Sequence, residues 1–225
     1  MAALTLPVTD VELVRGNLAE IRANIAAAAR RAGRGDGGEV RVLAATKYVP
    51  SAHMPVLARA GVRVVGENRA QDLVAKVAHH GDLFEWHFIG ALQSRRVRAI
   101  LPHVTLIHSL ASTSALDQIA RHRHLAKPGT KLLVEVNVAG EHAKAGIPPR
   151  DLATYLQDPP LPVVGLTAMV PRTEDPESSR PWFAALRELA REHDLGVLSM
   201  GTSQDYTVAV EEGATIVRIG ASLYA

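Results

Sequence analysis

The sequence predicts one α/β domain over residues 1–225, a (β/α)8 barrel of the TIM type. Eight apolar segments rich in β-branched residues recur along the chain, with helical patterns between them. Most of these segments are continuous apolar runs, which is typical of parallel strands that have helices on one face and a packed interior on the other. Short connections favour right-handed crossovers, and eight units of about 25–30 residues each match a barrel slightly below the usual size.

The expected strands are, in order, Val40–Thr46, Val62–Gly66, Glu85–Ile89, Thr105–Ser109, Lys131–Val138, Val163–Met169, Gly196–Met200 and Thr215–Ile219. The alternative is a doubly wound open sheet, which carries a G-x-G-x-x-G turn after its first strand. Here Lys47-Tyr48-Val49-Pro50 stands at that place. The glycine-rich run 33–38 precedes the first strand, so we interpret it as a flexible connection and not as a phosphate loop. The sequence therefore favours the barrel.

Helix signals fill the intervening segments. Thr9-x-x-Glu12 has the form of a capping box, and the helix that follows carries apolar residues at helical spacing up to a stop at Gly33. Later helices are indicated at Val97–Leu101 after Ser94, at Leu116–Leu125, after Ser178 or Ser179 with Pro181, and at Gln204–Glu212.

The chain has only six residues after the last expected strand, which leaves no room for an eighth following helix. We expect the amino-terminal helix to complete the outer ring, and we expect no separate carboxy-terminal domain.

Composition excludes several kinds of site and partner. The chain has no cysteine, which excludes disulfides, iron–sulfur clusters, thiolate zinc sites and a cysteine nucleophile. The pairs His79-His80 and His122-x-His124 lack a carboxylate at metal-ligand spacing, so no metal is expected. The formal net charge is +2, and the basic cluster 95–98 has no interleaved aromatic residues, so nucleic acid is not an expected partner. With no visible secretory signal and no apolar run near the roughly 18 residues of a membrane span, we expect a soluble, cytoplasmic protein without membrane contact.

The functional residues of such a barrel lie where strands end and the following loops begin. Lys47 closes the first apolar run, so its amine is expected at the barrel mouth, where burial and neighbouring cations would favour the nucleophilic free amine. From its position alone, the alternative is a surface lysine at a strand end. Segments 199–203 and 220–222, at the ends of the seventh and eighth strands, combine glycine with Ser or Thr hydroxyls, which is typical of an anion nest. Together these features indicate an aldehyde that bears a phosphate. Two classes fit: a Schiff-base aldolase, and pyridoxal 5'-phosphate (PLP) bound to the lysine.

Arg218, near the end of the last strand, directs a permanent cation into the same mouth. It could clamp a phosphate or carboxylate, donate to a pyridine nitrogen, or form a structural ion pair with an acidic barrel residue such as Glu135. As a donor to a pyridine nitrogen, it would keep that nitrogen unprotonated and weaken the ring as an electron sink. His87, inside the third strand, is either a hydrogen-bonded barrel histidine or a residue that lines the site.

Six stretches, in order, carry a more specific resemblance: Ala45-Thr46-Lys47, Gly66-Glu67-Asn68, Trp86-His87-Phe88-Ile89-Gly90-Ala91-Leu92-Gln93, Gly165-Leu166, Ser199-Met200-Gly201 and Val217-Arg218-Ile219-Gly220. In order and approximate spacing they resemble the pyridoxal phosphate homeostasis proteins (the YggS/PROSC family), which are related to the amino-terminal barrel of alanine racemases. The resemblance implies a monomeric barrel that serves vitamin B6 homeostasis and holds PLP as an internal aldimine on Lys47, without established catalytic turnover.

The resemblance also implies roles for other residues and partners. Asn68 would line the site and Arg218 would face the pyridine nitrogen. The residues expected around the phosphate are Ser199, Gly201, Gly220 and Ala221. PLP-dependent apoenzymes are the implied protein partners. The sequence departs from the family pattern at Arg95-Arg96, at Ala143-Lys144-Ala145 in the loop 142–147, at Thr202 and at Ala221.

An amino-acid racemase is the strongest enzyme alternative. Racemisation by two bases needs acid–base groups on opposite faces of the bound substrate. In alanine racemases one of them is a tyrosine from a separate carboxy-terminal domain, and we expect no such domain here. The prediction is therefore a non-catalytic carrier of PLP. An aldolase ranks third because it has no need of Arg218, and a pure interaction module leaves the polar strand ends unexplained.

Overall fold

Eight parallel strands close into a barrel in the computed structural model, which describes residues 8–141 and 145–224. The strands are β1 (Arg41–Ala45), β2 (Val64–Glu67), β3 (Glu85–Phe88), β4 (Leu106–Leu110), β5 (Lys131–Glu135), β6 (Val163–Thr167), β7 (Val197–Thr202) and β8 (Ile216–Ile219). They pair in chain order, and β8 pairs in parallel with β1. All eight expected strands are confirmed, with ends within three residues of the expected bounds. The open doubly wound sheet is wrong because the first and last strands close the barrel.

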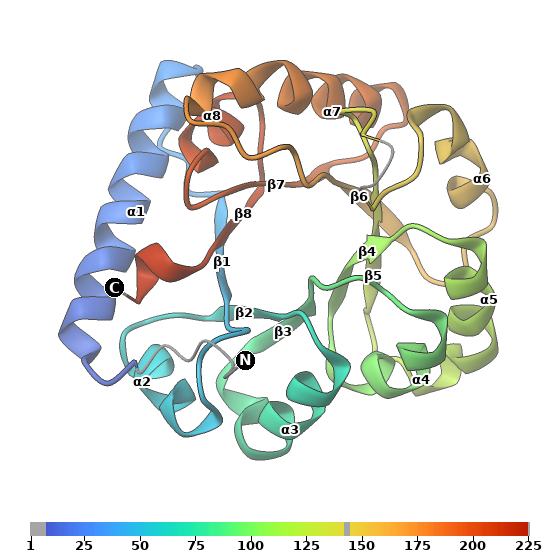
Figure 1. Ribbon diagram of the computed structural model, residues 1–225, viewed down its shortest axis with the longest axis horizontal. Helices are drawn as coiled ribbons and strands as arrows, with labels where there is room; N and C mark the ends of the chain where they lie inside the picture. Colours follow the sequence, from blue (N-terminus) through green and yellow to red (C-terminus); the bar gives the residue numbers. More distant parts are fainter. Residues whose placement is uncertain (1–7, 142–144, 225) are drawn as a thin grey trace.

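Within the described residues, eight α-helices form an outer ring around the strands (Figure 1). They are α1 (Val11–Arg31), α2 (Met54–Arg59), α3 (Ala70–His80), α4 (Val97–Ile100), α5 (Thr113–His122), α6 (Leu152–Leu156), α7 (Arg180–Glu192) and α8 (Tyr206–Glu211). Short 3-10 segments extend several of them, and one, η8 (Ala221–Leu223), follows the last strand. No helix in this part of the chain is long and apolar enough to cross a membrane. Residues 142–144 of the expected loop 142–147 lie outside the described residues.

Helix α1 occupies the place that a helix after β8 would take. It lies between α8 and α2 in the ring (Figure 1), and Asn24 Nδ2 donates to the Tyr206 hydroxyl of α8 at 3.0 Å. The expected amino-terminal cap at Thr9 is wrong by one residue, since the Asp10 carboxylate accepts from the amides of the first turn. The expected stop is confirmed: α1 ends at Arg31, and Gly33 follows with φ +70°.

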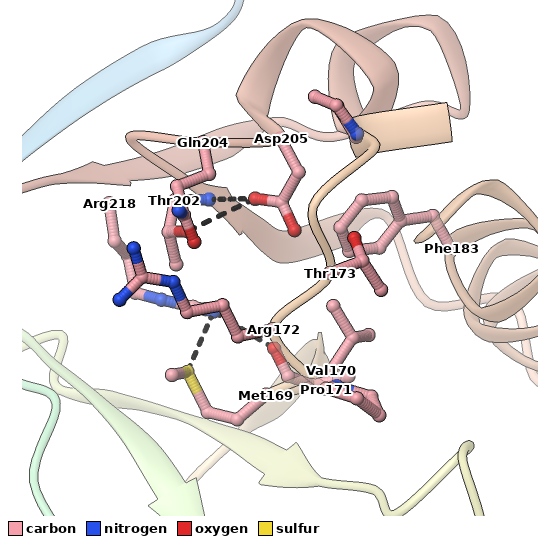
Figure 2. Close-up of a pocket in the computed structure, with 13 residues that line it drawn as sticks. Met169, Val170, Pro171, Arg172, Thr173, Phe183, Thr202, Gln204, Asp205 and Arg218 are labelled. Carbon is pink, nitrogen blue, oxygen red and sulfur yellow. Dashed lines mark hydrogen bonds between the residues drawn. The ribbon is translucent and has the colours of Figure 1, made fainter. Parts of the chain in front are cut away.

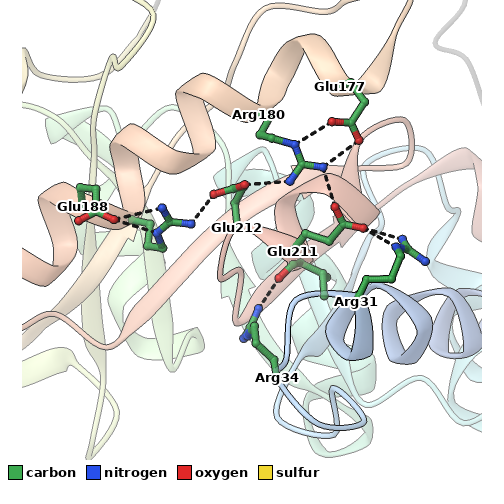
Figure 3. A network of polar contacts seen from close by, with 9 residues as sticks. Arg31, Arg34, Glu177, Arg180, Glu188, Glu211 and Glu212 are labelled. Carbon is green, nitrogen blue, oxygen red and sulfur yellow. Dashed lines mark hydrogen bonds and ion pairs between the residues drawn. The ribbon is translucent and has the colours of Figure 1, made fainter.

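An ion-pair network joins α1, α7 and α8 on the outside of the barrel (Figure 3). Arg180 pairs with Glu211 at 2.6 Å and with Glu212 at 2.8 Å, and Arg31 pairs with Glu211 at 2.7 Å. The two carboxylates have only 16% and 11% of their side chains exposed, so these pairs stabilise more than a fully exposed pair would. The network fixes α8, and with it the loop that leads from β7 into α8.

The barrel interior is divided between apolar and polar side chains. Because side chains of a strand alternate between its two faces, every second residue of each strand points inward. One inward set is an apolar cluster of Leu43, Val64, Leu106, Leu133 and Ile216. The buried polar residues of the strands include His87, His108, Thr167, Ser199 and Arg218. The polar set leads to the carboxyl ends of the strands, where the sequence places the functional residues.

Candidate functional site

A cavity of about 370 Å³ opens at the carboxyl ends of the strands. It brings together five of the seven residues that the sequence singles out: Lys47, Asn68, Arg218, Gly220 and Ala221. Thr202 and Ser203, from the segment 199–203 expected as an anion nest, also line it. Further residues line it that the sequence did not assign to the site: Tyr48, Ile89, Met169 and Tyr224. The cavity therefore collects residues from the first, second, third, sixth, seventh and eighth strand–loop connections.

Lys47 lies in the turn that follows β1, at the cavity. The burial expected for its side chain is wrong. The side chain is exposed, and Nζ lies 4.7 Å from the centroid of the Tyr48 ring. The reason is local, since the chain leaves the barrel wall after Thr46 and carries the lysine above the interior. The amine is consequently open to an aldehyde that enters from solvent.

The residues next to Lys47 are held by a buried polar anchor. Lys76 of α3 pairs with the fully buried Glu67 carboxylate and donates to the Thr46 carbonyl oxygen at 2.8 Å. The Thr46 hydroxyl donates to the same carboxylate at 2.6 Å. Because a buried charge is costly to leave unpaired, this group fixes the backbone from which Lys47 projects. The sequence motif contained Glu67, but its partner Lys76 carried no signal.

Arg218 is buried beneath the cavity and is held by uncharged acceptors. One terminal nitrogen, Nη1, donates to the Thr167 hydroxyl and the Ser199 hydroxyl, both at 2.8 Å, and to the Ser199 carbonyl oxygen at 2.6 Å. The other, Nη2, donates to the Ala168 carbonyl oxygen at 2.8 Å. Burial lowers the pKa of Arg218 to about 10, against the opposing fields of Glu135 and Asp205, so the guanidinium stays charged at neutral pH.

Two of the expected site residues lie away from the cavity. Ser199 is fully buried, and its hydroxyl lies between Arg218 and His108, 2.9 Å from His108 Nδ1. Gly201 lines a neighbouring cavity (Figure 2). Its φ is +88°, and a Cβ there would lie 2.6 Å from the Ala209 side chain, so only glycine fits this bend. Ser199 thus supports Arg218 from below, and Gly201 shapes the loop.

A continuous chain of hydrogen bonds runs from Arg218 through the barrel interior. After Ser199 and His108 it passes from His108 Nε2 to His87 Nδ1 at 3.0 Å, and from His87 Nε2 to the Glu85 carboxylate at 2.9 Å. Arg41 pairs with that carboxylate at the opposite end of the barrel. His87 is therefore a hydrogen-bonded barrel histidine, one of the two expectations from the sequence.

The two ends of this chain fix its direction. A guanidinium can only donate and a carboxylate can only accept. In each hydrogen bond between Arg218 and Glu85, the donor is therefore the group nearer to Arg218 and the acceptor is the group nearer to Glu85. Burial lowers the pKa of His108 well below its usual value, and burial also lowers that of His87. Both imidazoles are therefore neutral, with the proton on Nε2.

The loops after β7 and β8 meet at the other side of the cavity. The Gly220 amide donates to the Ser203 hydroxyl at 3.2 Å, and the Ser222 hydroxyl lies 2.9 Å from it. Asp205 holds the first loop, since its Oδ1 accepts from the Thr202 amide at 2.7 Å. The hydroxyls of Ser203 and Ser222 thus lie together with the backbone of a short 3-10 segment at this pair of loops, where the sequence leads us to expect an anion.

Two further polar residues line the cavity. The Asn68 Oδ1 atom is buried and has no hydrogen-bond partner. Tyr224 donates its hydroxyl proton to the Ala45 carbonyl oxygen at 3.2 Å, and burial raises the pKa of this phenol far above its usual value. The tyrosine is thus a fixed donor. Among the described residues, no group of three or more His, Asp or Glu could hold a metal ion.

Comparison with known proteins identifies the family. Residues 16–225 match the family model of the alanine racemase N-terminal domain. A pyridoxal phosphate homeostasis protein of Aquifex aeolicus is 40% identical over 218 residues, which cover 92% of this chain and 95% of the relative. Those of Pseudomonas aeruginosa and Escherichia coli K12 are 38% and 33% identical, each over 92% of this chain and over 93% and 94% of the relative. The chain belongs to the pyridoxal phosphate homeostasis proteins.

Solved structures agree with this family assignment. PipY of Synechococcus elongatus, solved with PLP bound, matches with a TM-score of 0.78 at 30% identity, over 94% of this chain and all of that one. An alanine racemase from Corynebacterium glutamicum shares the fold, with a TM-score of 0.67 at 16% identity. This chain covers 63% of the length of that racemase. The expected family and the expected barrel are therefore confirmed.

Proposed function

We propose that this pyridoxal phosphate homeostasis protein binds PLP at the barrel mouth, covalently through Lys47, and serves as a carrier or reservoir without robust turnover. The observation that carries the proposal is the cavity itself. It combines an exposed lysine amine, a charged arginine and an anion-binding loop pair within about 370 Å³. The related PipY, with PLP bound, supports the choice of ligand.

The residues of this structure fit such a cofactor. The unpartnered Asn68 Oδ1 atom at the cavity needs a polar ligand group, because a buried oxygen without a hydrogen bond is costly. Ser203 offers a hydroxyl at the loop pair, because its oxygen accepts from the Gly220 amide and the Ser222 hydroxyl and its own proton is left for a phosphate oxygen. We assign the phosphate to these loops, together with Gly220 and Ala221. PLP supplies an aldehyde for covalent attachment and a ring that can take up electrons.

The environment of the ring nitrogen favours binding over chemistry. We assign Arg218 to face that nitrogen, and its guanidinium is held rigidly by Ser199, Thr167 and Ala168. A charged donor there keeps the nitrogen unprotonated and makes the ring a weak electron sink. Tyr224, a tyrosine at the cavity, is kept protonated by its raised pKa and is a poor base for the racemase alternative.

Titration of the cofactor-free protein with PLP tests this assignment. An absorbance band near the boundary of the visible and violet ranges should form in the parent and be lost in Lys47→Ala. Lys131→Ala, which removes an exposed lysine at the start of β5, is the matched control and should titrate like the parent. Equal bands in the Lys47→Ala and parent proteins would overturn the proposal.

We further propose that the protein acts as a monomer in the cytoplasm and passes PLP to PLP-dependent apoenzymes. The family resemblance supports this proposal. Sedimentation of the loaded protein should give the mass of one chain. Reactivation of a cofactor-free PLP enzyme by the loaded protein should exceed that by the Lys47→Ala variant incubated with the same PLP, and equal reactivation would contradict transfer.

A further inference from the structure

A second cavity, of about 210 Å³, adjoins the cavity at the barrel mouth (Figure 2). Met169, Thr202 and Arg218 line both. Its other walls come from the loop after β6, the loop after β7, and the Phe183 ring of α7. The second space therefore lies directly beside the barrel mouth.

The second cavity carries an unpaired cation. Arg172 of the loop after β6 lines it with an exposed side chain, which extends along the cavity toward the side where Arg218 lies (Figure 2). Within the described part of the chain, Arg172 has no hydrogen bond or ion pair. Arg218 itself contacts carbonyl and hydroxyl oxygens and the Met169 sulfur, and no carboxylate.

The acidic group at this cavity does not balance the two guanidinium groups. Asp205 is buried, and its Oδ1 accepts from the amide and the hydroxyl of Thr202, at 2.7 and 3.1 Å. Its Oδ2 accepts from the Ser179 hydroxyl at 3.3 Å. Asp205 is thus used to hold the loop. Of the residues described as lining this cavity, it is the only acidic one, so the space has an excess of positive charge beside the cavity that Lys47 lines.

We propose that the second cavity binds the carboxylate of an amino acid whose amine exchanges with Lys47 for PLP, with Arg172 as the main partner. This inference rests on the proposed function, because the exchange needs PLP on Lys47. A guanidinium binds a carboxylate through two parallel hydrogen bonds, which supplies geometric selection as well as charge. The amines that this protein exchanges are therefore amino acids in preference to simple amines.

The exchange step balances without a further reactant. The nitrogen of the neutral amino acid amine forms a C=N bond to the aldehyde carbon of the cofactor, and the C=N bond from that carbon to Lys47 Nζ breaks. Both hydrogens of the incoming amine pass to Nζ, so Lys47 leaves as a neutral amine, and neither water nor an oxidant is consumed. Arg172 takes no part in these bonds and acts only by binding the carboxylate.

The test compares two amines that differ at the carboxylate. Loaded protein is titrated with L-alanine and with L-alaninamide, and displacement of Lys47 is followed by the shift of the cofactor absorbance. Arg172→Gln should weaken the apparent binding of L-alanine about tenfold, as expected for loss of a charge-assisted pair, and leave L-alaninamide unchanged. For each variant we take the ratio of the apparent dissociation constants of L-alanine and L-alaninamide. Comparing this ratio between variants cancels the difference in basicity between the two amines. Arg172→Lys should recover part of the loss, and Arg121→Gln, at an exposed arginine of α5, should match the parent.

A second measurement reports on Arg172 directly. Phenylglyoxal modifies accessible arginines, and L-alanine should slow modification of the Arg172 peptide but not of the Arg121 peptide. The loading of Lys47 with PLP is measured first, by mass spectrometry. This measurement distinguishes failure of the proposed function from failure of the present inference. A wild-type protein that does not load contradicts the proposed function. A loaded protein whose ratio of L-alanine to L-alaninamide binding is the same with and without Arg172 contradicts this inference alone.

Discussion

Acidification should destabilise this fold through the histidine pair inside the barrel. His108 is fully buried, and burial is the main cause that lowers its pKa well below the usual value. Burial likewise lowers the pKa of His87, although the hydrogen bond to Glu85 opposes the change. In the unfolded chain an imidazole takes up a proton near pH 6.5. The unfolded state therefore binds more protons below that pH, and stability is lost as the pH falls through the unfolded value.

The size of the loss follows from the number of imidazoles that stay neutral in the fold. An imidazole that stays neutral costs about 1.4 kcal/mol per pH unit below 6.5, so lowering the pH from 7.5 to 5.5 removes about 1.4 kcal/mol through His108, whose pKa lies well below the usual value. His87 adds to this loss in the same direction, because its pKa is also lowered. For a chain of this size, the loss through His108 corresponds to a fall in Tm of about 3 to 6 °C. Glu85 stays ionised in this window, because the hydrogen bond from His87 is the largest effect that holds its pKa below the usual range.

Thermal and urea unfolding at several pH values, followed by circular dichroism, measure this effect. His108→Gln removes one of the two titrating groups and should reduce the pH dependence by about 1.4 kcal/mol over the same window. His124→Gln, at an exposed histidine, serves as the control and should keep the dependence of the parent. A stability that does not change between pH 7.5 and 5.5, or a His108→Gln variant as pH-sensitive as the parent, would refute the assignment of neutral, buried imidazoles.

Three other outcomes are expected. Ser199→Ala should lower the free energy of unfolding by about 1–3 kcal/mol, because it leaves two buried groups short of a partner; urea unfolding measures this, and a loss within error of zero contradicts it. Gly90→Ala should abolish PLP binding or folding, since a Cβ there would lie 1.9 Å from the Asn68 carbonyl oxygen, whereas Gly196→Ala, with no atom within 4 Å, should preserve both in a PLP titration. Loaded protein with L-amino acids should show negligible deuterium wash-in at Cα and no racemisation by chiral chromatography; turnover in the range of about 1–10³ s⁻¹ of dedicated enzymes would restore the racemase alternative.

Much of the fold was predictable because most of the strands are continuous apolar runs, as expected for parallel strands covered by helices. The prediction of the helices was less complete. The sequence indicated α1, α4, α5, α7 and α8, and gave no signal for α2, α3 and α6. In the structure those three helices begin without a side-chain hydrogen bond at the amino-terminal cap. The same holds for α4, α7 and α8, which the sequence did indicate, so the missing caps alone do not explain the difference.

The site was predictable where a residue follows directly from a strand end, as with Lys47 and Arg218. It was less so after β7, because the pairing of β7 with β8 shifts register between Ser199 and Thr202. Such a bulge changes which side chains point inward, and sequence spacing alone does not reveal it. Consequently Ser199 lies under Arg218 and does not line the cavity, whereas Thr202 and Ser203 do. Likewise, Met169, Tyr224 and Arg172 reach the two cavities from loops or the chain end, where no periodicity guides a prediction.

The central claim is that Lys47 carries PLP covalently. The most direct measurement is borohydride reduction of the loaded protein, followed by intact-mass spectrometry and peptide mapping. The account predicts one phosphopyridoxyl group per chain, located on the peptide that contains Lys47, and none in the Lys47→Ala variant. An unmodified Lys47 peptide from fully loaded protein, or an adduct on another lysine, would contradict it.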